Sequence, residues 1–141
     1  MKGPEFDLPP LAPPDVVAEW DELADAVCRE LVRAGLPAHR GDVEGGPPGL
    51  PGAEVHVDRV ADGGVYVDWR AGAELATTAL ELFAKGIDYT DPPSVVRHHR
   101  DVCTFMRDAL TGILASAGFR VEESDPHTHG CAVYVKGLQS A

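Results

Sequence analysis

The spacing of apolar residues along the chain predicts three helices. From Asp15 to Ala34-Gly35, apolar residues recur every three or four positions, which is typical of one buried helical face. A second stripe covers residues 73–85, with Leu75, Ala79, Leu82 and Phe83 predicted to be buried, and ends at Gly86. The third and longest helix follows an Asp91 cap, takes Pro92-Pro93 in its first turn and ends at Ala117-Gly118.

A change to strict alternation predicts strands between these helices. The runs 53–60 and 65–70 alternate apolar and polar residues and indicate a hairpin. Val55 and Val67 share a face only if the loop has an odd number of residues, so loops of three or five residues fit. In one permitted register Asp58 lies opposite Asp68, and in the other Glu54 meets Arg70 and His56 meets Asp68.

A second hairpin is predicted near the end of the chain, from Phe119 to Val135, with residues 124–130 as its loop. Alternating strands need one covered face and one wet face. The predicted fold class is therefore α+β: a two-layer sandwich in which a four-stranded, mainly antiparallel sheet of two hairpins carries three helices on one face. The element order is α-β-β-α-α-β-β. A short edge strand near residues 36–39 is compatible with this arrangement.

The Pro-rich segment 1–14 is predicted to be a flexible tail, with the opening residues 1–6 resembling a cloning remnant, and residues 15–141 form a single domain. A chain of 141 residues with 44% hydrophobic residues can bury a core without covalent staples. No apolar run approaches a membrane span, and three cysteines cannot all pair within one chain. We therefore expect a cytoplasmic protein with no membrane partner.

Charge adds a regional feature to this picture. The net charge is −11, which disfavours nucleic acid as a partner because phosphates attract a basic surface. All of the acidic excess lies in residues 1–91, whereas residues 92–141 carry five acidic and five basic side chains. The acidic charge thus favours a one-sided field that would attract a basic protein, although simple solubility explains it equally well.

The polar face of the predicted sheet is the first candidate site. Alternation places charged and aromatic side chains there, and Tyr and Arg are common anchors in protein interfaces. The alternative is a solvated face held together by cross-strand pairs. The predicted partner-binding residues are Glu54, His56, Asp58, Tyr66, Asp68, Arg70 and Tyr134.

Two clusters could carry other chemistry. On an extended chain Asp125, His127, His129 and Cys131 project to one side and could bind zinc, although the spacing matches no established zinc pattern and a polar loop is the alternative. His99 and Cys103 are four residues apart on the third helix, close enough to form a Cys–His nucleophile. Because both types are often buried in cores, a packing role is favoured for this pair.

No catalytic motif dominates the sequence, so a non-enzymatic role is favoured. Size, acidity and the α+β layout are typical of bacterial immunity proteins, antitoxins and chaperones that neutralise a basic partner. The leading prediction is accordingly a small acidic protein-binding module without a cofactor. The alternatives are a metal-binding enzyme or sensor that uses His127, His129 and Cys131, and a structural subunit that forms a homodimer.

Overall fold

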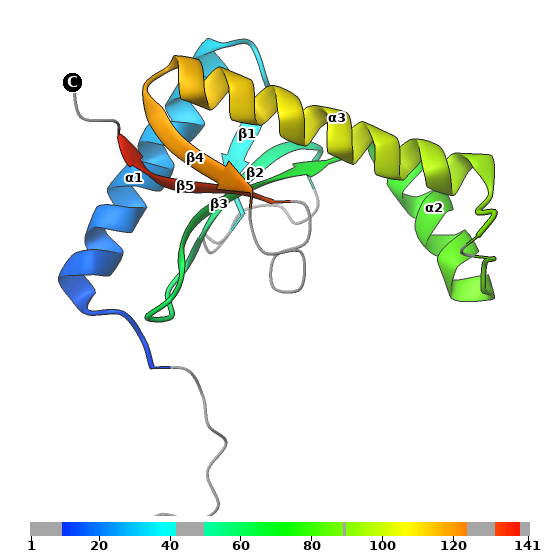
Figure 1. Cartoon of the computed structure of the whole chain (residues 1–141), viewed down its shortest axis with the longest axis horizontal. Coiled ribbons are helices and arrows are strands. Elements are labelled where there is room, and N and C mark those ends of the chain that lie inside the picture. Colours follow the sequence, from blue (N-terminus) through cyan, green and yellow to red (C-terminus); the bar gives the residue numbers. More distant parts are fainter. Residues whose placement is uncertain (1–9, 42–49, 89, 124–131, 139–141) are drawn as a thin grey trace, which may run out of the picture.

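Three helices and a five-stranded sheet make up the fold in the computed structural model (Figure 1). The structure describes residues 10–41, 50–88, 90–123 and 132–138. The helices are α1 (Pro14–Arg33), α2 (Ala73–Lys85) and α3 (Ser94–Ser116). The strands are β1 (Ala38–Arg40), β2 (Gly52–Asp58), β3 (Gly64–Arg70), β4 (Phe119–Glu123) and β5 (Val133–Leu138). The α+β class predicted from the sequence is confirmed.

The sheet is mixed and has the strand order β1-β2-β3-β5-β4, which corrects the predicted four-stranded sheet. The fifth strand is β1, which pairs in parallel with β2 through Ala38 and Ala53. The other neighbours are antiparallel: β2–β3 and β4–β5 as the two predicted hairpins require, and β3–β5 where the hairpins join. β1 has only three residues, which is too short for an alternation of apolar and polar residues that would predict a strand.

The first hairpin has the predicted parity but not the predicted pairs. Val55 lies opposite Val67, so the apolar residues of both strands share one face, and residues 59–63 form a five-residue loop. Asp58 faces Gly64 rather than Asp68, and Glu54 faces Asp68 rather than Arg70. This register replaces the Asp58–Asp68 pair that one prediction contained with another acidic pair, in which Glu54 contacts Arg70 and Asp68 lies near His56.

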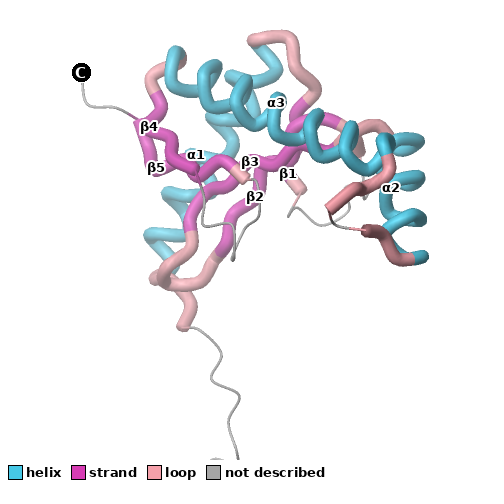
Figure 2. The backbone as a smooth tube through the Cα atoms, turned by 45° about the vertical axis from the view of Figure 1, so that its right-hand side comes forward, coloured by secondary structure: helices cyan, strands magenta, loops and turns pink. Residues whose placement is uncertain are grey.

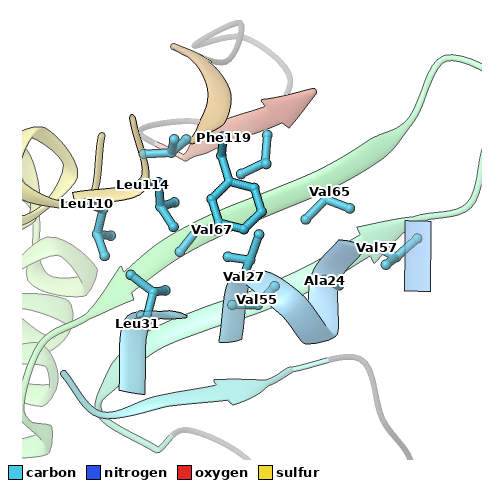
Figure 3. Close-up of a cluster of buried hydrophobic side chains, with 13 residues drawn as sticks. Ala24, Val27, Leu31, Val55, Val57, Val65, Val67, Leu110, Leu114 and Phe119 are labelled. Atoms are coloured by element: carbon cyan, nitrogen blue, oxygen red, sulfur yellow. The ribbon is translucent and has the colours of Figure 1, made fainter. Parts of the chain in front are cut away.

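The core lies between one face of the sheet and two helices, α1 and α3 (Figure 3). Leu31 of α1, Leu110 and Leu114 of α3, and Phe119 at the start of β4 are buried there. The valines of β2, β3 and β5 face them: Val55, Val57, Val65, Val67, Val133 and Val135. The prediction of three helices on the sheet is wrong for α2, because this helix packs chiefly on α3.

The ends of the helices explain how they are joined to the sheet. α1 ends where Gly35 adopts φ +100° and Leu36 N–H donates to the Leu31 carbonyl, the backbone pattern of a Schellman cap. α3 starts at Ser94, later than the predicted Asp91 cap. With Asp91 as the cap, Pro92 would have to adopt helical dihedrals, which the following Pro93 disfavours.

Part of the segment predicted as a tail lies against the first hairpin. Leu11 forms a bridge with Val60, and Ala12, which is buried, donates its backbone N–H to the Arg59 carbonyl over 2.9 Å. Pro14 then opens α1, a position where the missing N–H costs nothing.

Among the described helices, none combines the length and apolar character needed to cross a bilayer.

Candidate functional site

The polar face of the sheet contains the predicted partner-binding residues, but its carboxylates contact basic side chains of the same face. Arg70 Nε donates to Glu54 Oε2 over 2.5 Å, and His39 Nε2 lies 3.8 Å from the same oxygen. His56 Nδ1 lies 3.8 Å from Asp68 Oδ2. These contacts are diagonal across β2 and β3 rather than direct, so two of the predicted side-chain pairs form in a different register.

Aromatic side chains form a row in the middle of this face. The Tyr66 ring stacks between His56 and Tyr134, with centroid distances of 5.9 and 5.0 Å. Tyr66 is only 5% exposed, so it is not the open anchor that the sequence predicted. Its burial, with smaller effects of Tyr134 and Asp58, raises the pKa of the phenol above its ordinary value. The partner-binding role of the whole face stays a prediction.

The predicted metal ligands cannot be placed. Asp125, His127, His129 and Cys131 lie outside the described residues, so zinc binding there also stays a prediction. Within the described ranges, no cluster of three or more His, Cys, Asp or Glu side chains has the arrangement of a metal site.

The acidic residues of α1 are partly neutralised from the sheet side. The Arg40 guanidinium of β1 donates to Asp21 Oδ1 over 2.9 Å and to Asp25 Oδ1 over 2.8 Å, and Arg59 lies 3.4 Å from Asp21. Glu19 and Glu22 of the same helix are exposed, and the described structure gives them no ion pair. The helix therefore contributes a negative outer surface.

α2 stands apart from the rest of the molecule. It lies with the N-terminal half of α3 beyond the end of the sheet, as Figures 1 and 2 both show. Three of its 13 residues are charged, compared with eight of 20 in α1, yet Ala79 is its only fully buried residue. Leu80 is 70% exposed, and Phe83, which the sequence predicted to be buried, is 46% exposed. We call α2 and residues 94–106 of α3 the overhang.

A cavity of about 360 Å³ opens where the overhang meets the end of β3. That volume lies within the range of pockets that hold small molecules or a partner's side chain. The walls are mostly apolar, and polar groups reach the cavity from β3 and α3. The lining residues are Asp68, Trp69, Phe83, Ile87, Pro92, Val96, His99, Arg100 and Cys103.

The polar side of the cavity contains the Cys–His pair noted in the sequence. Cys103 Sγ lies 4.0 Å from His99 Nε2, as expected for residues one helical turn apart. The same sulfur lies 4.0 Å from the Trp69 carbonyl oxygen, toward which the thiol can donate. Both side chains are half-buried, whereas Arg100 is exposed at its position on α3. The pair is therefore placed at a cavity and not inside the central core.

Sequence reasoning found the Cys–His contact but missed the cavity around it. Trp69 and Val96 belong to elements that are brought together only by the tertiary fold, so no local spacing links them. The available signal was α2 itself, whose sequence has more apolar positions than one buried stripe requires: Ala76, Leu80 and Phe83 continue a second stripe at helical spacing.

The chain matches no protein-family model, and no curated protein or solved structure is similar to it.

Proposed function

We propose that the protein is a small binding module whose overhang receives an apolar or aromatic side chain of a basic partner protein. The observation that carries this proposal is the position of α2. This helix leaves Phe83, which lines an apolar cavity, and Leu80, three residues earlier on the same helix, both exposed, although exposed apolar residues are normally scattered singly. An exposed apolar helix face next to a pocket has the form of an interface hot spot.

Charge supports a basic partner rather than an acidic or neutral one. The net charge of −11 produces a field that attracts cations and speeds their association. Residues 73–106, which contain the overhang, carry five carboxylates and three cations. The polar face of the sheet is a weaker candidate for the docking surface, because its carboxylates already contact His39, His56 and Arg70.

Binding can be tested with synthetic peptides and the fluorescence of Trp69, which lines the cavity. A Trp20→Phe variant leaves Trp69 as the sole tryptophan of the chain. We expect a Lys-rich peptide with one phenylalanine to shift the emission saturably, and added salt to weaken its binding. Two matched peptides, one with alanine for phenylalanine and one with glutamate for lysine, should bind at least about tenfold more weakly.

The location of the site is tested by two phenylalanines that differ in position. Phe83→Ala should weaken binding of the basic peptide at least about tenfold, because Phe83 lines the cavity. Phe105→Ala is the control, since Phe105 is 67% exposed on α3 and does not line the cavity. Equal effects of the two variants, or equal binding of the three peptides, would contradict the proposal.

A second copy of the chain is the competing occupant of the overhang. Sedimentation analysis of the wild-type protein and of Leu80→Glu separates the two cases. A monomer in both samples agrees with a basic partner. A dimer that Leu80→Glu converts to a monomer would overturn that occupant and assign the surface to self-association.

A further inference from the structure

Cys103 and His99 lie one helical turn apart and both line the same apolar cavity. The reactive form of a cysteine is the thiolate, and a neighbouring imidazole produces it by accepting the thiol proton. His99 Nε2 lies 4.0 Å from Cys103 Sγ, a long contact of the kind that shortens when a substrate binds. The surrounding Trp69, Ile87 and Val96 side chains provide an apolar surface beside the sulfur.

Cys28 provides a contrast within the same protein. It is half-buried in α1, and burial raises the pKa of its thiol, with a smaller opposing effect of Arg40 and a smaller raising effect of Asp25. A raised pKa leaves less thiolate at neutral pH, so Cys28 should react slowly. It does not line the cavity.

We propose that Cys103 is an acylation site that takes its acyl group from an apolar acyl thioester. The bond between Cys103 Sγ and the acyl carbon forms, and the bond between that carbon and the donor sulfur breaks. The thiol proton passes to His99 and then to the departing thiolate, so no oxidant or reductant is needed. The cavity walls accept the acyl chain, and Arg100 supplies a cation for an anionic carrier group on the donor.

This inference uses the cavity of the proposed function but stands without the partner protein. Acylation requires only the thiol, the base and the apolar walls. If both are correct, the acyl chain fills the space that the partner's side chain needs, and acylated protein should lose affinity for the Lys-rich phenylalanine peptide.

The test incubates the full-length protein with octanoyl-coenzyme A and, as a matched short-chain donor, acetyl-coenzyme A. Mass spectrometry of the intact protein and of its peptides measures the adducts, and hydroxylamine release identifies a thioester. We expect one octanoyl group on Cys103, formed faster than acetyl, with Cys28 reacting much more slowly. Cys103→Ser should abolish this adduct.

The role of the base is tested with adjacent histidines. His99→Gln should slow octanoylation about a hundredfold or more, the lower end of the usual contribution of a general base. His98→Gln should leave the rate unchanged, because His98 is exposed and does not line the cavity. Circular dichroism of each variant checks folding. If His99→Gln does not fold, the ratio of Cys103 to Cys28 labelling in the wild-type protein still tests whether Cys103 is the acylation site.

Three results would overturn the inference: no adduct on Cys103, equal labelling of Cys103 and Cys28, or equal rates in folded His99→Gln and His98→Gln. None of these results affects peptide binding, which is measured without a thioester. Conversely, if the peptide does not bind, the rates of octanoylation still test whether Cys103 is acylated. The two proposals therefore fail separately.

Discussion

The overhang differs in the burial of its apolar residues from the sheet layer, by which we mean the five strands, α1 and residues 107–116 of α3. In the sheet layer, Leu31, Leu110 and Leu114 are enclosed by valines from three strands, and none of them is measurably exposed (Figure 3). In the overhang, Leu80 and Phe83 remain in contact with solvent beside a cavity of about 360 Å³. The apolar side chains of the sheet layer are therefore buried, whereas part of the apolar surface of the overhang is exposed to solvent.

This difference indicates which part of a small domain can hold a cavity for binding. A close-packed core tolerates neither missing nor added atoms without a cost in stability. A helix pair that extends past the sheet can hold a cavity, because its packing contributes less to the central core. Regions with few buried apolar contacts are also the ones that open most readily to admit a ligand.

The largest expected effect comes from deleting the same side chain in the two regions. Leu114→Ala should lower the free energy of unfolding by about 2–5 kcal/mol, because the lost methyl groups leave a cavity in the enclosed core. Leu80→Ala should change it by less than about 0.5 kcal/mol, since most of that side chain is already in water. Urea unfolding followed by circular dichroism measures both. Similar losses would show that the overhang is packed as tightly as the core.

Much of the sheet layer could be predicted from the sequence because its signals are local. The odd hairpin loop puts Val55 and Val67 on one face as expected, and the strands of the predicted second hairpin pair as β4 and β5. The bounds of α2 also match the predicted 73–85, although that helix belongs to the overhang. These features depend on spacing along one or two neighbouring segments. β1 escaped a firm prediction because its parallel pairing with β2 depends on a strand that is only three residues long.

The overhang could not be predicted, because its defining feature is tertiary. The pattern of α2 indicates which residues are apolar but not whether the helix lies on the sheet or on α3. Phe83 was therefore predicted to be buried and is instead half exposed. His99 and Cys103 were correctly expected to touch, yet their setting depends on Trp69, whose carbonyl approaches Cys103 from a different element.

A substitution that adds one methyl group should distinguish the closed sheet layer from an open helix surface. Gly64 has φ +146°, and a Cβ atom there would lie 2.7 Å from Tyr134 Cε1. Gly64→Ala should therefore cost about 1–3 kcal/mol through backbone strain and the clash. Gly112→Ala is the matched control: Gly112 lies inside α3, and beyond its own chain neighbours and helix backbone no atom lies within 4 Å of the added Cβ, so this substitution should stabilise the protein by about 1 kcal/mol. A Gly64→Ala variant as stable as the wild type would disprove the close packing of Tyr134.

Alkaline pH should destabilise the sheet layer through Tyr66. Burial raises the pKa of Tyr66, so the folded protein retains the phenolic proton at a pH where the unfolded chain has released it. The unfolded state then binds fewer protons, and the free energy of unfolding falls as the pH rises above about 10. Tyr66→Phe lacks the ionisable group and should show a smaller fall. Urea unfolding of both proteins between pH ~9 and pH ~11 measures the difference, and parallel curves would contradict it.

The smallest expected effect concerns ion pairs at the surface of the two regions. Lys136 Nζ lies 2.6 Å from Glu122 Oε1 on the outer face of the sheet, whereas the described structure gives Lys85 of α2 no ion pair. Because both members of the Lys136 pair are exposed, Lys136→Met should lower the free energy of unfolding by less than about 1 kcal/mol. Salt should reduce this loss further, since it screens exposed charges. Lys85→Met removes only a cation from the last turn of α2, so its salt-dependent loss should be the smaller of the two. A loss at Lys136 that persists in high salt would mean that the pair is held in place by the surrounding sheet rather than by charge alone, which would extend the tightly packed region from the core to the outer face.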